Sequence, residues 1–300
     1  MIKRRILIVG CNGLLGQALA ENFSRNRGDE LLLASVEEKF VGDSNFTYVQ
    51  LDISKRSETK KVVLDFFPDI VINAAAYTNV DGCEDNKELA WNINVSGVKY
   101  LVEGCRVVDA KLIHLSTDFV FDGMKGPYNE LDKPNPISYY GRSKLGSENE
   151  IKIGGIPFAI IRTNVIYGIQ KGVKKDFVQW VVENLRIEKQ INVATDQMNN
   201  PTFVNDLVDG ILLTLEKKRT GIYNIGGIEL ISRYDFAVKI AEVFDLDKIL
   251  INPILTSQLK QKAKRPLNGG LIILKAQTEL NYQPHSLEEN LKHIRRNFGS

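Results

Sequence analysis

A tyrosine and a lysine four residues apart, Tyr140 and Lys144, carry the strongest chemical signal in the sequence. That spacing is one helical turn, so both side chains should share one face of a helix. A nearby ammonium favours the phenolate and lowers the pKa of a tyrosine, which is otherwise about 10. The pair therefore predicts a phenol that protonates a carbonyl oxygen while hydride reaches the carbon, a step worth roughly 10²–10⁴-fold.

Thr117 supplies a hydroxyl for the same reaction. It follows an apolar run at 112–115 that predicts a strand, and parallel strands present their following loops to ligands at one edge of the sheet. The hydroxyl can polarise the carbonyl oxygen there. A Tyr-x-x-x-Lys match alone is typical of solvated helix faces, but its position after a glycine-rich turn and a hydroxyl favours reduction of a ketone.

Gly10, Gly13 and Gly16 lie between an apolar run at 6–9 and a helical pattern that starts at Leu14. Free amide N–H groups and the positive end of a helix dipole can hold a pyrophosphate at such a junction. The spacing differs from the commonest dinucleotide motif, G-x-G-x-x-G, and a tight turn with close helix packing is the alternative interpretation. The context favours a dinucleotide cradle.

Three further segments would border such a cofactor. Ser35 stands where an acidic residue would bind the ribose of NAD, with Glu37 and Glu38 after it, which leaves NADH and NADPH both open. Asp52 fits a hydrogen bond to the adenine amine and helix capping equally well. The small side chains at 74–76 would let backbone lie against the cofactor, or simply pack closely.

The elements around these residues predict an α/β fold with a doubly wound Rossmann-type parallel sheet. Short runs rich in β-branched residues alternate with helical patterns, which is typical of buried parallel strands and right-handed crossovers. We expect strands at 6–9, 31–34, 47–50, 70–73, 112–115, 158–162 and 222–225, and helices at 14–25, 58–67, 86–108 and 206–215. Residues 1–165, rejoined by about 203–228, would bind the dinucleotide, and 166–202 with 229–300 would form a smaller C-terminal substrate-binding domain.

Composition narrows the class of protein. The 300 residues carry 39 basic and 37 acidic side chains, a balance that disfavours nucleic acid as a partner. Three cysteines predict neither a disulfide framework nor a thiolate metal site, and the three scattered histidines predict no metal site either. The odd number and wide spacing of the cysteines fit a reducing cytoplasm best. No apolar stretch approaches the roughly 20 residues of a membrane span.

Several longer segments carry a family resemblance. They are the turn at 10–16, Asn73 to Thr78, Ser116 to Gly123, Tyr140 to Lys144 and Arg162 to Gly168. With these the chain resembles the extended short-chain dehydrogenase/reductase family over nearly its whole length. The most similar members reduce the C4 ketone of a nucleotide-linked 6-deoxyhexose with NAD(P)H in nucleotide-sugar and polysaccharide biosynthesis. The expected conversion is dTDP-4-dehydro-L-rhamnose to dTDP-L-rhamnose.

The resemblance also implies roles for single residues. Thr117, Tyr140 and Lys144 would be catalytic, and Asp118, Val165 and Arg265 would contact the substrate, Arg265 by neutralising its diphosphate. A homodimer is left open. Cofactor contacts are expected at Gly10, Asn12, Gly13, Leu14, Leu15, Gly16, Ser35, Asp52, Ile53, Ala74, Ala75, Ala76, Thr78, Tyr140 and Lys144.

Two departures from the family pattern matter. Asn164 and Val165 replace the usual Ser-Trp, which removes an aromatic wall from the sugar site, and Ser35 repels a 2′-phosphate less than an acidic residue, which favours NADPH slightly. Two other functions stay open: a regulatory subunit without activity, resembling the beta subunit of methionine adenosyltransferase, and a sugar-nucleotide epimerase. Phe119 stands where 4,6-dehydratases place an acid, which argues against a dehydratase.

Overall fold

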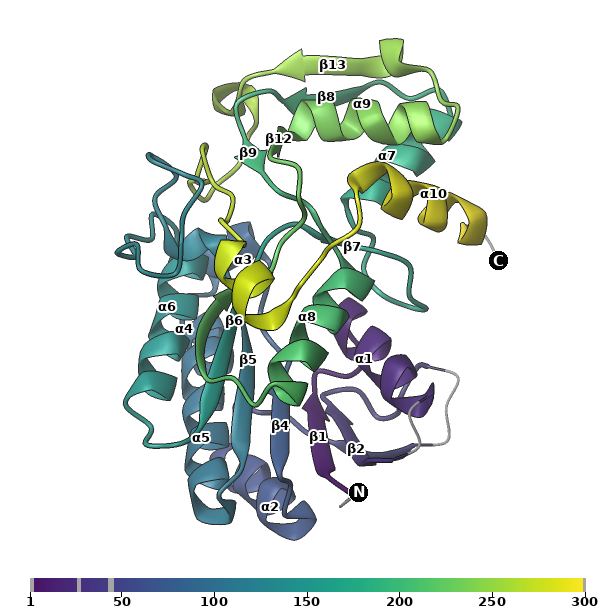
Figure 1. The fold of residues 1–300 in the computed structure, drawn as a ribbon. Coiled ribbons are helices and arrows are strands. Elements are labelled where there is room, and N and C mark those ends of the chain that lie inside the picture. The colour runs from purple at the N-terminus through teal and green to yellow at the C-terminus, as the bar shows by residue number, and fades with distance from the viewer. Residues whose placement is uncertain (1–2, 26–27, 43–45, 299–300) are drawn as a thin grey trace.

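A sheet of seven parallel strands organises the computed structural model, which describes residues 3–25, 28–42 and 46–298. The strand order is β11-β6-β5-β4-β1-β2-β3 (Figure 1). The order reverses between β1 and β4, and ligands bind at the carboxyl ends of the strands beside such a point. The strands are β1 Arg5–Val9, β2 Glu30–Ser35, β3 Thr47–Gln50, β4 Ile70–Asn73, β5 Lys111–Thr117, β6 Phe158–Thr163 and β11 Gly221–Asn224.

The central strands are apolar on both faces because helices cover both. Ile6 and Ile8 of β1 point into one hydrophobic core, and Leu7 and Val9 point into another. The first core includes α1 and α8, and the second includes α2 and α5. This confirms the predicted doubly wound α/β class. The helices are α1 Leu14–Arg25, α2 Arg56–Phe66, α5 Gly97–Val108, α6 Tyr139–Lys152 and α8 Val204–Glu216.

The single helix predicted over 86–108 is interrupted. The chain forms α3 Val80–Asp85, α4 Lys87–Trp91, a π-helical turn at Asn92–Ser96 and then α5. In the π turn the side chain of Asn94 hydrogen-bonds both backbone groups of Tyr77 and the hydroxyl of Ser143. A polar side chain that ties two loops together explains the wider turn, a feature often found near functional sites.

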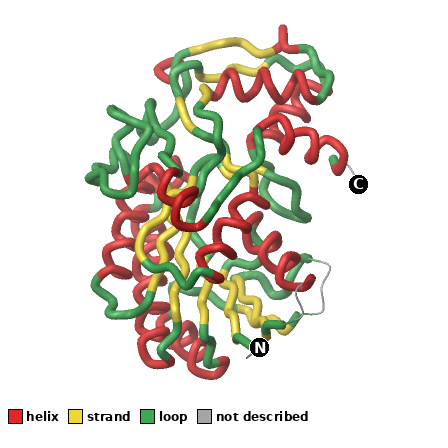
Figure 2. The backbone as a smooth tube through the Cα atoms, in the orientation of Figure 1, coloured by secondary structure: helices red, strands yellow, loops and turns green. Residues whose placement is uncertain are grey.

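Smaller elements lie beyond the carboxyl edge of the sheet (Figures 1 and 2). β8 pairs with β13 in parallel, and α9 contacts α7 and α10. β11 pairs with β6 in the main sheet, and α8 packs on α1, so 204–224 returns to the dinucleotide half. The division into two domains stays a prediction. These elements are β7 Ile166–Tyr167, α7 Phe177–Arg186, β8 Ile191–Ala194, β9 Met198–Asn199, β10 Thr202–Phe203, β12 Ile231–Ser232, α9 Arg233–Val243, β13 Ile251–Ile254 and α10 Leu287–Asn297.

Short helical turns complete the described chain. They are 3₁₀ turns at Asp118–Val120, Lys248–Leu250 and Thr256–Gln258, and a second π turn at Ala276–Leu280. Across residues 3–25, 28–42 and 46–298, none of the helices has both the length and the apolar character that crossing a membrane requires.

Candidate active site

One cleft of about 1290 Å³ runs along the carboxyl edge of the sheet. This volume exceeds the roughly 300–1,000 Å³ of an ordinary small-molecule site, which fits a cofactor and a substrate side by side. The cleft extends from the glycine turn, past the ends of β2, β4 and β5, to α9 and the loop that holds Arg265. Every residue that the sequence assigned to a cofactor, substrate or catalytic role lines it.

The three glycines of the turn have different reasons to be glycine. Gly10 has φ of 79°, and a Cβ there would lie 2.5 Å from the backbone nitrogen of Ala75. A Cβ on Gly16 would lie 2.2 Å from the carbonyl oxygen of Gly10. At Gly13 the nearest atom would be 3.4 Å away, so described protein atoms leave room for a side chain, yet Gly13 lines the cleft. Tight packing explains two of the glycines, whereas the backbone at Gly13 is open toward the cleft.

Beside this turn, a carboxylate lies where the sequence interpretation placed only Ser35. The hydroxyl of Ser35 donates to Oε2 of Glu37 at 2.6 Å, and Nδ2 of Asn12 donates to the same oxygen at 3.2 Å. Burial opposes ionisation, but these two hydrogen bonds lower the pKa of Glu37. Glu37 lines the cleft as an anion. The sequence places Glu37 after Ser35, but the sequence pattern alone assigns it no cofactor contact.

Asp52 serves a local role in the structure. Its Oδ1 accepts hydrogen bonds from the amide of Ser54 at 2.9 Å and from the hydroxyl of Ser54 at 2.7 Å. It stabilises the turn that leads into α2, whose N-cap residue is Lys55. Asp52 also lines the cleft, together with Ile53 and the alanines at 74–76. The adenine contact stays a prediction.

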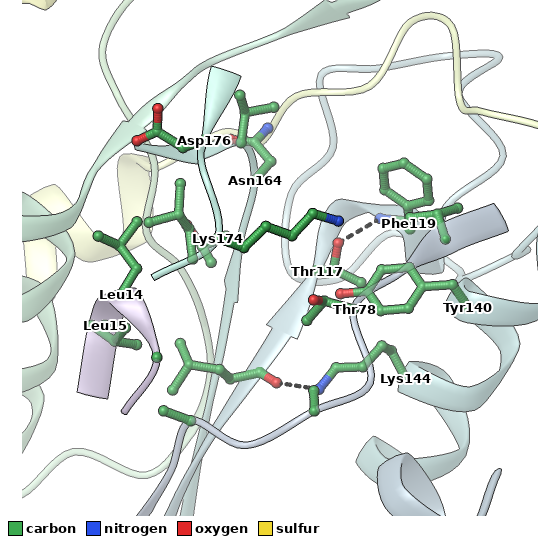
Figure 3. Close-up of a pocket in the computed structure, with 18 of the residues that line it drawn as sticks. Leu14, Leu15, Thr78, Thr117, Phe119, Tyr140, Lys144, Asn164, Lys174 and Asp176 are labelled. Atoms are coloured by element: carbon green, nitrogen blue, oxygen red, sulfur yellow. Dashed lines mark hydrogen bonds between the residues drawn. The ribbon is translucent and has the colours of Figure 1, made fainter. Parts of the chain in front are cut away.

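Tyr140 enters the cleft from the start of α6. The hydroxyl of Ser138 caps this helix by accepting from the amide of Gly141 at 3.1 Å. The ring of Tyr140 packs edge-on against Phe119, with centroids 5.6 Å apart. Thr117 ends β5, and its Oγ1 accepts from the amide of Phe119 at 3.2 Å. Figure 3 shows Thr78, Thr117 and Tyr140 pointing toward one another in the pocket.

The expected effect of Lys144 on Tyr140 is not present. Burial and the nearby Asp118 raise the pKa of Tyr140, although a hydrogen bond with Thr117 opposes the rise. The ammonium of Lys144 instead donates to the carbonyl of Leu115 at 2.6 Å (Figure 3). The phenol is therefore protonated at neutral pH, the form from which a ketone reduction starts.

A buried histidine helps to position Lys144. The ammonium lies 3.3 Å from Nε2 of His114, which also contacts the hydroxyl of Ser147 at 2.9 Å, and Nδ1 lies 3.1 Å from the amide of Asn73. Burial and the charge of Lys144 hold the pKa of His114 well below its usual value, so the imidazole is neutral. Burial also lowers the pKa of Lys144 to about 8.

A buried ion pair fixes α6 against the sheet beneath the site. Glu148 accepts from the hydroxyl of Ser116 at 2.7 Å and from Nε and Nη2 of Arg162 at 2.9 and 2.7 Å. The side chains of Glu148 and Arg162 are 0% and 1% exposed. Bidentate geometry and the extra hydrogen bond compensate for burying both charges. The pair joins α6 and β5, which carry Tyr140 and Thr117, to β6, which ends two residues before Val165.

The substrate end of the cleft contains a buried acid. Asp118 accepts from the hydroxyl of Thr117 at 3.1 Å and from the amide of Asn164 at 3.4 Å. Burial raises the pKa of Asp118 to about 6, although these hydrogen bonds oppose the rise. Val165 has φ of 41°, a backbone conformation that β-branched residues rarely adopt.

Arg265, expected to neutralise the diphosphate of the substrate, is already paired within the protein. Its Nη1 and Nη2 donate to the two carboxylate oxygens of Asp81 at 2.6 and 2.9 Å. This ion pair joins α3 to the loop that borders the cleft. Sequence reasoning missed a second arginine, Arg233, which lines the same end. It is the first residue of α9, more than sixty positions after Val165, and only the folded chain brings it there.

Comparisons with known proteins agree with this geometry. A family model described as the RmlD substrate binding domain matches residues 4–299. A dTDP-4-dehydrorhamnose reductase of Aggregatibacter actinomycetemcomitans is 33% identical over 303 residues, covering 97% of this chain and 98% of that protein. The crystal structure of a dTDP-4-dehydrorhamnose reductase from Clostridium acetobutylicum superposes with a TM-score of 0.89 at 30% identity, covering 99% and 100% of the two chains. A third, from Bacillus anthracis in complex with NADP, gives 0.84 at 29% identity, covering 98% and 99%.

Proposed function

The chain belongs to the RmlD substrate binding domain family, and from this we propose that it reduces the C4 ketone of a nucleotide-linked 6-deoxyhexose with NADH or NADPH. The proposed reaction converts dTDP-4-dehydro-L-rhamnose to dTDP-L-rhamnose, the substrate named for the relatives at 33% and 30% identity. A bound nicotinamide cofactor supplies the hydride. The observation that carries the proposal is the meeting of Thr117, Tyr140 and Lys144 in one cleft with the glycine turn.

Each residue of this group has a proposed task. Tyr140 donates its phenolic proton to the oxygen at C4, and Thr117 holds that oxygen by a hydrogen bond from its hydroxyl. Lys144 binds the nicotinamide ribose through its ammonium. The ammonium of Lys144 is kept in place by its contacts with Nε2 of His114 and with the carbonyl oxygen of Leu115. Together these groups supply the proton and hold the oxygen at C4 in position to receive it.

The residues present fit a dinucleotide. The unfilled space at Gly13 leaves backbone accessible to a pyrophosphate at the start of α1. Asn12, Ser35 and Glu37 offer polar atoms for the adenosine ribose, and the alanines at 74–76 leave space beside the nicotinamide half. The weaker repulsion expected from Ser35 favours NADPH, whereas the carboxylate of Glu37 acts in the opposite direction. Both cofactors belong in the assay.

The direct test follows the oxidation of NADH and NADPH by absorbance with dTDP-, UDP-, GDP- and CDP-linked 4-keto sugars. We expect turnover with a dTDP-linked 4-keto-6-deoxyhexose and little with the others. Cofactor binding without oxidation in the presence of every sugar would refute the proposal and favour a regulatory subunit. Purification with tightly held NAD⁺ and interconversion of epimers without net oxidation would favour an epimerase instead.

A further inference from the structure

Two arginines lie at the substrate end of the cleft, and they differ in how their charges are met. Arg265 is paired with Asp81 through two hydrogen bonds and also donates to the carbonyl of Ala263 at 2.7 Å. For Arg233 the structure gives no comparable carboxylate within 4.0 Å among the described residues. The cation with unused hydrogen-bonding capacity is therefore Arg233.

The surroundings of Arg233 hold its side chain in place but leave one of its N–H donor groups without a hydrogen-bond partner. Its backbone amide donates to the carbonyl of Gln197 at 3.0 Å, which fixes the start of α9. The guanidinium carbon lies 4.7 Å from the ring centroid of Phe177, a cation–π contact. Nη1 is buried, and no atom of the described chain accepts a hydrogen bond from it. A buried charged donor without a partner is costly, and an anionic ligand would remove that cost.

Arg233 lines the same cleft as Thr117 and Tyr140. Burial lowers the pKa of Arg233 to about 10, with Asp118 opposing and Arg265 adding to this effect, so the guanidinium stays charged at neutral pH. The carboxylate of Asp118 accepts hydrogen bonds from Thr117 and Asn164, and among the described residues it forms no ion pair with Arg233. A hexose held with C4 at Tyr140 presents its C1 phosphate about one sugar ring away. Arg233 lines the same cleft as Asp118 and Tyr140, so it lies in the site that such a phosphate would enter.

We propose that Arg233 binds the diphosphate of the nucleotide sugar, whereas Arg265, held by Asp81, shapes the wall of the site. The inference rests on the proposed function only in taking the substrate to be a nucleotide sugar. Its planar guanidinium matches two phosphate oxygens, and Phe177 limits its rotation. Arg233 thus contributes to substrate affinity and takes no part in the proton transfer.

Calorimetric titration with dTDP and with thymidine tests this without any turnover. In Arg233→Met we expect dTDP to bind roughly 10- to 100-fold more weakly, since a charge-assisted bond to phosphate is lost. Thymidine and NADH should bind as they do to the unmodified protein. Arg233→Lys, which retains charge but not the planar fork, should fall between the two.

Arg186→Met is the matched control. Arg186 also stacks on a phenylalanine, at 4.8 Å from the centroid of Phe298, but it does not line the cleft. This variant should bind dTDP normally. NADH affinity reports whether each variant is folded. If Arg233→Met does not bind NADH, Arg233→Lys takes its place, because its smaller loss of dTDP affinity tests the same contact.

The outcomes separate this inference from the proposed function. If dTDP binds through Arg233 but no keto sugar is reduced, the inference stands and the reductase proposal fails. If dTDP-linked keto sugars are reduced and Arg233→Met keeps its KM and its affinity for dTDP, the inference fails alone. Loss of dTDP affinity in Arg265→Met but not in Arg233→Met would overturn it as well.

Discussion

Replacing Glu37 with glutamine should shift the cofactor preference toward NADPH. The carboxylate of Glu37 is held by Ser35 and Asn12 at the adenosine end of the cleft. Glutamine keeps an oxygen that can accept both hydrogen bonds but removes the charge. A 2′-phosphate is repelled by that charge and a 2′-hydroxyl can donate to it, so the substitution changes the two affinities in opposite directions.

The size of the shift follows from charge and exposure. Two unit charges about 4 Å apart interact by about 4 kcal/mol at an effective dielectric constant of 20 and by about 1 kcal/mol in water. Glu37 is exposed at the rim, so we place the repulsion near the lower value, at about 1–2 kcal/mol, after screening. The ratio of NADPH to NADH affinity should then rise roughly tenfold in Glu37→Gln.

The assay is a direct titration of both cofactors with the protein, followed by fluorescence. Glu38→Gln is the matched control, because Glu38 is the neighbouring residue with the same charge but does not line the cleft. An unchanged ratio in Glu37→Gln, or an equal change in both variants, would show that Glu37 does not face the ribose.

Two further substitutions test the environment of the site. Glu148→Ala should lower the free energy of unfolding by about 3–5 kcal/mol in denaturant titrations, since Arg162 would be left buried without its partner. Because Arg162 holds the pKa of Glu148 below its usual value, this stabilisation is present above about pH 4.5 and is lost as pH falls. Equal stability of the two proteins at pH 7 would contradict that account. Asp118→Asn should raise the free energy of unfolding at pH 8 but not at pH 4, because burial raises the pKa of Asp118 from 3.8 to about 6 and its ionised form is therefore disfavoured in the folded protein. A gain that is the same at both pH values would contradict this assignment.

Local patterns were sufficient to predict the sheet and most of the cleft. β3 and β4 have the predicted bounds. For β4 the reason is that Ile70 to Asn73 form a short apolar run buried on both faces, whereas β3 is an edge strand with half-buried and exposed residues. Most cleft residues could be predicted once the strands were predicted, because they lie in loops that directly follow strands ending at the same edge of the sheet.

Features set by contacts between distant segments could not be predicted in this way. The π turn at Asn94 depends on backbone groups of Tyr77, seventeen residues earlier. The pairing of Arg265 with Asp81 joins residues 184 apart. The pKa of Tyr140 follows from burial and Asp118 rather than from the neighbouring lysine. In each case the sequence supplies the chemical group, and only the folded chain supplies its partner.

Transfer of deuterium tests the central claim most directly. With NADH deuterated at the transferable C4 position and dTDP-4-dehydro-L-rhamnose, we predict that NMR will find the label at C4 of dTDP-L-rhamnose. Tyr140→Phe should bind NADH with unchanged affinity and form this product roughly 10²–10⁴-fold more slowly. A product without deuterium at C4, or normal turnover by Tyr140→Phe, would contradict the account.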